Sequence, residues 1–383
     1  MKETTDIIIV GGGCQGVSLA YHLTKKKAGK IILLEKSYLG SGATGACAAG
    51  IRAQWGLPIN CKLAIKSLEK FEQMDEELDF PGGIDLKQGG YLVLAYQEEE
   101  IVQLKKNVVL QNSLGIKSKI ISPGEVRSMV PYLNTENLIE ATYHQRDGYA
   151  DPHKVVFAYG EASVRLGVEI RKFTPVKRII VDEVRVMGVE TDKGTIYAPI
   201  VAVTAGIYST GLLSNIGINI PLYGERHEAL VTEPLEPMVK PMIISFSLNL
   251  YCQQTPHGSF IMGCGDPHKP VGEDISSTPQ FLFTMTKKIT HLLPFMKKVR
   301  IVRQWGGSYD MTPDATPIIG SVSEIKGLYL STGFSGHGFM LSPMSGELLS
   351  QLIIGETPSV DISGLNLERF QIGELIREPS VVG

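Results

Sequence analysis

The sequence has 383 residues, of which 43% are hydrophobic and 20% charged, with a formal net charge of −3. These values are typical of a soluble globular protein, and they give no electrostatic reason to expect binding to nucleic acid or to an anionic membrane. No run of about 18 apolar residues is present, so we expect no membrane-spanning helix. The chain is long for one hydrophobic core and suits two closely joined domains.

The number of cysteines is odd and no pair has CxxC spacing. We therefore predict free thiols in a reducing compartment, with neither a disulfide framework nor a metal site. The first predicted strand begins almost at once, without an apolar leader, so we expect a cytoplasmic protein. The five cysteines are Cys14, Cys47, Cys61, Cys252 and Cys264.

The first 35 residues predict a strand, a glycine turn, a helix and a second strand. Apolar runs at 6–10 and 31–34 flank a Gly-Gly-Gly-Cys-Gln-Gly turn. Gly11 permits the tight turn, Gly13 lets the backbone approach a pyrophosphate, and Gly16 lets the helix pack close to the strand. The N–H groups at the helix N-terminus favour phosphate binding. The pattern indicates a dinucleotide site rather than a structural turn, and leaves FAD and NAD open.

Further along the chain, helical and strand patterns alternate. Ser122-Pro123-Gly124-Glu125 has the form of a capping box at a helix start, and another strand begins at 168–170. Helices are expected over 61–79, 97–114, 151–166, about 278–292 and 338–353, and strands over 89–94, 176–181, 184–190, 200–203, 229–232, 242–245, 258–263 and 327–333.

Small residues fill the segment 40–50 almost completely. Such a segment is either a flexible loop or a backbone that passes close to a large flat ligand. The strand at 200–203 also ends in small residues, Thr204-Ala205-Gly206, which suits ligand approach at the carboxyl edge of a sheet.

Segments from the start, middle and end of the chain are expected to share one nucleotide-binding layer. We assign 1–85, 141–219 and 312–383 to this discontinuous domain. The inserted segments 86–140 and 220–311 are expected to form a substrate domain with a mixed sheet, and the substrate would bind in the cleft between the domains.

Two later motifs distinguish between the cofactors. The segment 306–320 contains Tyr-Asp-Met-Thr-Pro-Asp, and 333–343 contains Gly-Phe-Ser-Gly-His-Gly-Phe-Met. Together with the N-terminal turn, they resemble the FAD-dependent family that includes D-amino-acid oxidase, glycine oxidase and sarcosine oxidase. Within it, the chain looks most similar to β subunits of heteromeric sarcosine oxidases and of dye-linked L-proline dehydrogenases.

This resemblance implies an α/β fold of the glutathione-reductase type, with a Rossmann-like FAD-binding domain and an inserted mixed-sheet substrate domain. FAD is expected to bind noncovalently, and Glu35 is placed to accept hydrogen bonds from ribose hydroxyls. The expected cofactor contacts are Gly11, Gly13, Cys14, Gln15, Gly16, Glu35, Lys36, Ser41, Gly42, Ala43, Thr44, Gly50, Ile51, Val176, Thr204, Ala205, Gly206, Gly307, Gly336, His337, Gly338, Phe339 and Met340.

The loop and helix start at Gly336–Met340 would stabilise negative charge near flavin N1 and the C2 carbonyl. His337 is either a catalytic group there or a structural hydrogen-bonding residue.

Family substrates are amino acids or N-alkyl amino acids, whose carboxylate suits an arginine clamp. Arg52 is the favoured candidate, because monomeric sarcosine oxidase-like enzymes carry a substrate arginine there. The alternative is that Arg52 lies on the surface or contacts the pyrophosphate of the cofactor. Glycine oxidase and D-amino-acid oxidase place the clamp before Thr-Pro-Asp, where this chain has Ser308-Tyr309.

Three further side chains are candidates for the substrate pocket. Tyr251 falls where family members place a pocket tyrosine, and its alternative is a core tyrosine. His227 opens an inserted strand that could face the pocket, and Tyr309 is a similar candidate.

Met340 replaces the lysine with which monomeric sarcosine oxidase promotes the reaction of its flavin with O2. We therefore expect the β-type catalytic subunit of a dehydrogenase complex that oxidises a small secondary amino acid, such as L-proline or sarcosine, to the imine by hydride transfer to flavin N5. A stand-alone oxidase that produces H2O2 is the alternative, and a flavin-bearing subunit without turnover is a third.

Partner subunits or another electron acceptor are implied, and FMN at a subunit interface is compatible with the resemblance. The histidine that tethers this FMN in heteromeric sarcosine oxidases aligns with Pro152, one residue before His153.

Overall fold

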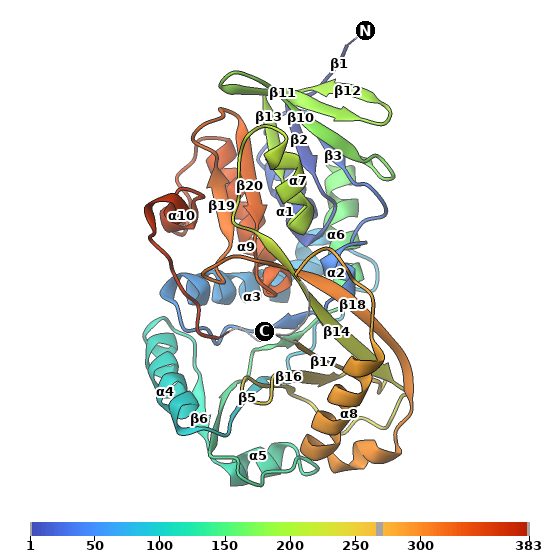
Figure 1. Cartoon of the computed structure of the whole chain (residues 1–383), viewed down its shortest axis with the longest axis vertical. Helices are drawn as coiled ribbons and strands as arrows, with labels where there is room; N and C mark the ends of the chain where they lie inside the picture. The colour runs from blue at the N-terminus through green and yellow to red at the C-terminus, as the bar shows by residue number, and fades with distance from the viewer. Residues whose placement is uncertain (1, 266–270, 381–383) are drawn as a thin grey trace.

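The computed structural model describes residues 2–265 and 271–380. The ends of the predicted domains at residues 1 and 383 lie outside this range. Figure 1 shows two halves, one built around a parallel sheet and the other around a larger mixed sheet. This arrangement confirms the predicted α/β architecture with a second, mixed sheet.

The first half contains a six-stranded sheet drawn from the start, middle and end of the chain. Its strands are parallel except for the edge strand β19. In spatial order they are β19 (Ile318–Ser321), β20 (Leu328–Thr332), β13 (Ile200–Val203), β2 (Ile7–Val10), β3 (Ile31–Leu34) and β9 (Glu169–Arg171).

A four-stranded sheet packs beside this layer, and a two-stranded one joins the halves. Apolar side chains of β10, β11 and β12 share a core with β2, β3 and β13. The small sheets comprise β1 (Glu3–Thr4), β12 (Gly194–Tyr197), β11 (Arg185–Thr191) and β10 (Val176–Asp182), and β4 (Gly50–Ile51) with β8 (Gly148–Tyr149).

The second half contains an eight-stranded sheet, antiparallel except where β15 pairs with β5. In spatial order its strands are β18 (Ile301–Met311), β14 (Tyr223–Thr232), β17 (Phe260–Gly265), β16 (Leu250–Gln254), β15 (Met242–Ser245), β5 (Tyr91–Ala95), β7 (Glu140–His144) and β6 (Lys119–Ile121).

Helices cover both sheets, and those predicted from periodicity begin and end within three residues of the observed bounds. The Ser122 capping box is present, because Ser122 Oγ accepts from Glu125 N and the Glu125 carboxylate accepts from Ser122 N. The helices are α1 (Cys14–Lys25), α2 (Ala43–Ala46), α3 (Pro58–Leu78), α4 (Glu98–Ser113), α5 (Pro123–Met129), α6 (Pro152–Arg165), α7 (Ser209–Ser214), α8 (Pro279–Leu292), α9 (Gly338–Ile353) and α10 (Arg369–Ile372).

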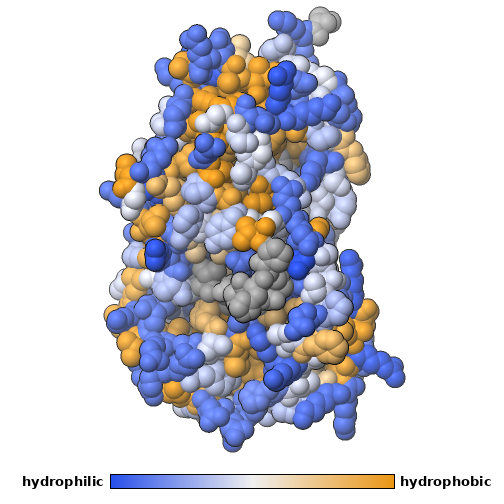
Figure 2. Space-filling model, in the orientation of Figure 1, coloured by the Kyte–Doolittle hydropathy of each residue, from blue (hydrophilic) through white to orange (hydrophobic). Residues whose placement is uncertain are grey.

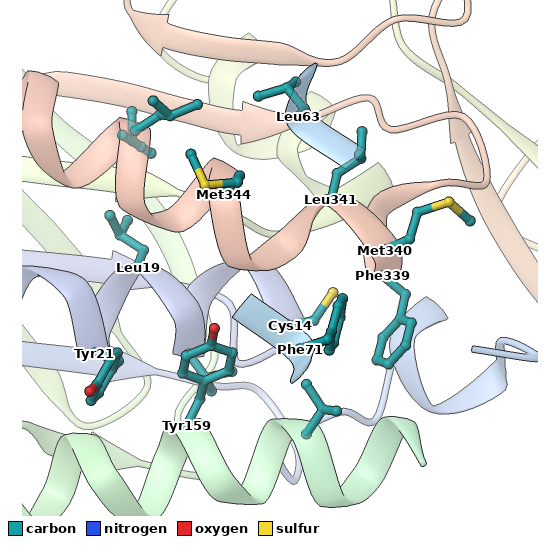
Figure 3. Close-up of a cluster of buried hydrophobic side chains, with 14 of the residues drawn as sticks. Cys14, Leu19, Tyr21, Leu63, Phe71, Tyr159, Phe339, Met340, Leu341 and Met344 are labelled. Carbon is teal, nitrogen blue, oxygen red and sulfur yellow. The ribbon is translucent and has the colours of Figure 1, made fainter. Parts of the chain in front are cut away.

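The helices α1, α3, α6 and α9 enclose the main core of the first half (Figure 3). Leu19, Phe71, Tyr159 and Met344 meet there from four different helices. A Cβ at Gly346 would lie 2.2 Å from Ser18 Oγ, so the glycine allows α9 to approach α1 closely. The cofactor-facing start of α9 is thereby fixed against the glycine turn.

The sequence did not predict every strand of the structure. Neither β16 nor β18 was predicted, and β14 begins six residues before the expected 229–232. Gly306 and Gly307 lower the strand propensity of β18, but a Cβ at Gly306 would lie 2.5 Å from Ile275 O. Close backbone packing therefore explains why position 306 is a glycine.

The predicted domain boundaries remain a prediction. The strand β7 was assigned, from residue 141 on, to the nucleotide-binding segments, but it pairs with β5 and β6 of the larger sheet instead.

On the face shown in Figure 2, hydrophilic residues are spread over both halves, with hydrophobic ones among them. Within the described ranges, no helix combines the length and apolar character needed to cross a membrane.

His22 in α1 provides a test of the buried core. Burial lowers its pKa to about 3, whereas a histidine in an unfolded chain titrates near 6.5. Below pH 6.5 the unfolded chain therefore binds a proton that the folded chain does not, and stability falls as the pH falls. We predict that between pH 7 and pH 5 the wild type loses about 2 kcal/mol more unfolding free energy than His22→Gln. Urea unfolding at both pH values measures this, and equal losses would contradict it.

Candidate active site

Parallel strands bring three predicted cofactor residues to one edge of the six-stranded sheet. Val10 is opposite both Leu34 and Val203 in the register, so Gly11, Glu35 and Thr204 follow the ends of adjacent strands. Thr204 Oγ1 lies 3.1 Å from both Val10 O and Gly11 O. This carboxyl edge is where ligands bind in open α/β sheets.

The glycine turn has the close packing that the sequence predicts. Gly11 has a φ of +113°, a conformation that favours glycine. A Cβ at Gly16 would lie 1.9 Å from Gly11 O, so only glycine lets α1 cross β2 at this distance. Gly13 stands at the N-cap and offers no side chain to the first turn of α1. The helix start is therefore open to an anion, and these residues fit a dinucleotide phosphate.

Glu35 is held at the tip of β3 by backbone donors. Its carboxylate accepts from Gly12 N at 2.7 Å and from Ser37 N at 2.8 Å, and Ser41 Oγ lies 3.4 Å away. The side chain is buried, which fixes a carboxylate beside the glycine turn. This position suits hydrogen bonds to ribose hydroxyls.

The start of α9 lies against the start of α1. Gln15 Nε2 donates to Gly338 O at 2.8 Å, and Cys14 N donates to Thr44 Oγ1 at 3.2 Å. The small-residue segment 40–50 is folded tightly, since a Cβ at Gly45 would lie 2.4 Å from Gly40 O. Three distant parts of the chain therefore line one continuous surface.

The other predicted cofactor residues lie around this surface or support it. Lys36 Nζ lies 3.1 Å from the centroid of the Tyr208 ring, beside Ala205 and Gly206. Gly42 and Ala43 lie at the start of α2. A Cβ at Gly307 would lie 3.0 Å from the Ala46 side chain of this helix, so β18 passes close to α2. Val176 packs against the core between the four-stranded and the six-stranded sheet. Gly50 and Ile51 form β4, and Phe339 and Met340 begin α9.

A cavity lies between the sheets, next to the α9 start. Four of the five predicted catalytic residues line it, namely Arg52, Tyr251, Tyr309 and His337. Sequence reasoning missed Trp55, Tyr91, Met242 and Ile244, which also line it. The Gly-Gly pair before Tyr91 signalled a strand, but no local pattern indicated which of its faces meets the cavity.

Arg52 is buried, with 4% of its surface exposed, and its guanidinium carbon lies 3.9 Å from the Trp55 ring centroid. Nη1 donates to Gln54 O at 3.1 Å and Nη2 donates to Ser380 O at 2.6 Å. Burial lowers the pKa of the guanidinium, but an arginine remains charged under these conditions. The side chain is a fixed cation at the cavity wall, which does not fit a surface arginine.

Three tyrosines give the cavity neutral hydroxyl groups. Burial raises the pKa of Tyr91 to about 12 and also raises the pKa of Tyr251 and of Tyr309. The Tyr309 ring covers the backbone at Gly336, where a Cβ would lie 2.2 Å from it. All three hydroxyls therefore stay protonated and can donate to a carboxylate.

His337 is buried at the N-cap of α9, with its ring centroid 4.7 Å from that of Trp55. Nδ1 lies 3.3 Å from Ser335 O, and Nε2 has no hydrogen-bond partner among the described residues. Burial and the charge of Arg52 lower its pKa to about 3. The imidazole is therefore neutral near pH 7.

His227 does not line the cavity but lies behind one of its walls. Its ring stacks on Tyr309 with centroids 3.7 Å apart and planes at 10°. Nε2 lies 3.0 Å from Glu225 Oε1. His227 can therefore act on the cavity only through Tyr309.

A family model described as FAD dependent oxidoreductase matches residues 6–352. The chain belongs to this family, which confirms the predicted resemblance and the assignment as an FAD-dependent oxidoreductase.

Particular relatives match almost the whole chain. Sarcosine oxidase subunit beta of an Arthrobacter species is 30% identical over 98% of this chain and 94% of its own. The crystal structure of L-proline dehydrogenase from P. horikoshii has a TM-score of 0.92 and 33% identity, covering 98% of this chain and 100% of its own. Glycine oxidase from Geobacillus kaustophilus shares the fold, with a TM-score of 0.87 and 24% identity over 96% of this chain and 99% of its own.

Gly16→Ala tests the cofactor surface. The added methyl group would collide with Gly11 O and push α1 away from β2, so we predict at least a tenfold weaker FAD affinity (about 1.4 kcal/mol). Flavin absorbance per protein after gel filtration, followed by FAD titration, measures the effect. Gly211→Ala is the control, because a Cβ at Gly211 meets nothing within 4 Å. Equal FAD affinity of the two variants would contradict the assignment.

Proposed function

We propose that this protein oxidises a small secondary amino acid, such as L-proline or sarcosine, to the imine, as the β-type catalytic subunit of a dehydrogenase complex. The observation that carries the proposal is the placement of Arg52. Among the described residues that line the cavity, it is the only permanent cation, and it lies beside aromatic and aliphatic walls. Such a cavity suits a small apolar molecule with one carboxylate.

The likeness to sarcosine oxidase subunit beta and to L-proline dehydrogenase supports a secondary amine as the substrate class. Arg52 would hold the carboxylate through its remaining N–H groups, helped by the hydroxyls of Tyr91 and Tyr251. The uncharged His337 adds no second positive charge, which favours the neutral amine that oxidation needs. FAD, when bound, supplies the two-electron acceptor for the hydride from the carbon beside nitrogen.

Positioning is the main contribution expected from the chain itself. Fixing the carboxylate at Arg52 orients the C–H bond of the substrate toward the α9 start, near Gly336 and Gly338. The positive end of α9 is placed to favour negative charge that develops there. We assign FAD to the continuous surface from the glycine turn to Met340, bound noncovalently.

The uncharged side chain at Met340 favours a dehydrogenase, which passes its electrons to an acceptor other than O2, over an oxidase. It lines the cavity as a buried, uncharged side chain, so no cation at this position lowers the cost of reducing O2. We infer that electrons pass to a partner subunit or another acceptor in the cytoplasm. The alternative is a stand-alone oxidase that forms H2O2, favoured by the shared fold with glycine oxidase.

An interfacial FMN remains part of this proposal. His153 in the first turn of α6 lies against the small-residue segment, where a Cβ at Gly45 would be 2.8 Å from its ring. Flavin extracted from the assembled complex would contain FMN besides FAD, and extraction of FAD alone would exclude it.

Anaerobic titration tests the substrate class. We expect L-proline or sarcosine to bleach the oxidised flavin band more efficiently than glycine, because a secondary amine fills the apolar cavity better. Hydroxyproline would show whether a ring hydroxyl is tolerated. If no amino acid in this panel bleaches the flavin, the proposed function is wrong.

Arg52→Lys tests the carboxylate clamp. A lysine cannot reproduce the planar two-donor fork, so we predict that kcat/KM falls about 10- to 100-fold, mainly through KM. Arg303→Lys, an exposed arginine of β18, should leave the rates unchanged. An unchanged KM in Arg52→Lys would contradict the clamp.

Met340→Lys tests the electron acceptor. A cation near the flavin should speed reoxidation of the reduced enzyme by O2 about tenfold or more, whereas Met340→Leu should not. Stopped-flow reoxidation of variants with equal FAD content measures this. An equal reoxidation rate in wild type and Met340→Lys would contradict the inference that the uncharged Met340 keeps the reaction with O2 slow.

A further inference from the structure

The C-terminal segment Glu374–Ser380 reaches Arg52, which lines the cavity. In Figure 1 the chain after α10 passes α3 on its way toward α4. Asp314 anchors it, since its carboxylate accepts from Ile376 N at 3.1 Å and its carbonyl from Glu378 N at 3.1 Å. Thr316 Oγ1 donates to Ile376 O at 2.6 Å. The segment is thus tied to the loop that follows β18.

Glu378 is buried and its carboxylate is saturated with donors. Oε1 accepts from Gly56 N at 2.9 Å and from Ser380 N at 3.0 Å. Oε2 accepts from Leu57 N at 3.1 Å and from Asn60 Nδ2 at 2.9 Å. One side chain therefore joins the turn after Arg52, the start of α3 and the next residues of its own segment.

The same arrangement places an acceptor on Arg52. The Ser380 carbonyl lies 2.6 Å from Arg52 Nη2, while Asn107 Nδ2 of α4 donates to Ser380 Oγ at 3.2 Å. Because Glu378 accepts from Ser380 N, it fixes the residue whose carbonyl receives the guanidinium. Two of the five arginine N–H groups are used by backbone carbonyls, which leaves the others for a ligand.

Two buried carboxylates, those of Asp147 and Glu378, flank the turn that follows Arg52, and neither forms a direct ion pair with its guanidinium. Asp147 Oδ1 accepts from Ala53 N at 2.9 Å, and Glu378 accepts from Gly56 N and Leu57 N. Within the described ranges, no carboxylate oxygen lies within 4.0 Å of an Arg52 nitrogen. Negative charge nearby lowers the cost of burying the Arg52 cation. Because these carboxylates do not contact the guanidinium, its remaining N–H groups stay available for a ligand.

We propose that Glu378 is a positioning residue for substrate binding, which acts by fixing the Arg52–Leu57 turn and the Ser380 carbonyl so that the Arg52 guanidinium faces the cavity. The proposal rests on the proposed function, because it assumes that Arg52 binds the substrate carboxylate. Glu378 does not itself line the cavity, so its influence on the substrate passes through Arg52.

The test compares Glu378→Gln with Glu374→Gln, an exposed glutamate of the same segment, in FAD-loaded full-length protein. An amide keeps the shape but loses the negative charge and half of the acceptor capacity. The probe is tetrahydrofuran-2-carboxylate, which has a carboxylate but no oxidisable amine, and binding is read from the flavin spectrum. KM and kcat for L-proline or sarcosine are measured alongside.

We expect Glu378→Gln to raise the dissociation constant of the probe and KM about tenfold, with kcat within about twofold. FAD content and melting temperature should stay near wild type, and Glu374→Gln should match wild type throughout. Glu378→Asp, whose shorter carboxylate cannot span both groups of donors, should show the same loss and serves if Glu378→Gln does not fold.

Wild-type affinity for the probe in Glu378→Gln would overturn the positioning role. Loss of FAD and of melting temperature in proportion to the loss of affinity would also overturn it, because that pattern marks a structural residue. Arg52→Lys separates this outcome from failure of the proposed function. If the wild type does not bind the probe, or Arg52→Lys binds it equally well, the clamp itself is wrong.

Discussion

The buried charge of Arg52 is the constraint on which the rest of the cavity depends. A guanidinium removed from water is tolerated only where its donors and its charge are compensated. Here the Trp55 face, two backbone carbonyls and two nearby carboxylates provide the compensation. None of these groups covers the guanidinium completely. A cation that is stable in the folded protein therefore remains able to bind a small carboxylate.

The position of this cation relative to the cofactor surface follows from the two sheets. The parallel sheet brings the ends of β2, β3 and β13 to one edge, and α9 begins beside them. The strands β16 and β18 of the larger sheet carry Tyr251 and Tyr309 to the opposite wall. Close approach at Gly336 joins the two, since a side chain there would collide with the Tyr309 ring of β18, while Gly16 keeps α1 close to β2 within the first half. Gly336 therefore lets the cofactor surface and the wall of the amino-acid pocket lie close together.

Local patterns predicted the parts of the fold whose causes are local. The glycine turn, the capping box at Ser122 and the helix periodicities each depend on neighbours within a few residues. They did not predict β18, because Gly306 and Gly307 resemble loop residues until the backbone of another segment is packed against them.

Of the site residues, Arg52 was indicated by resemblance. Tyr91 and Trp55 were missed because only tertiary packing shows which side of a strand or turn meets the cavity. His227 was expected to face the pocket, but its ring stacks on that of Tyr309, which lines the cavity in its place. Nothing in the sequence indicated that Ser380, 328 residues away, would provide an acceptor for Arg52.

The central claim is that Arg52 is held charged and accessible for a substrate carboxylate. A crystal structure of the FAD-loaded protein with tetrahydrofuran-2-carboxylate tests it most directly. The account predicts both carboxylate oxygens within about 3 Å of Arg52 nitrogens, with the ring directed toward the start of α9 and Ser380 still bound to the guanidinium. A carboxylate bound elsewhere in the cavity, with Arg52 engaged only by backbone carbonyls, would contradict it.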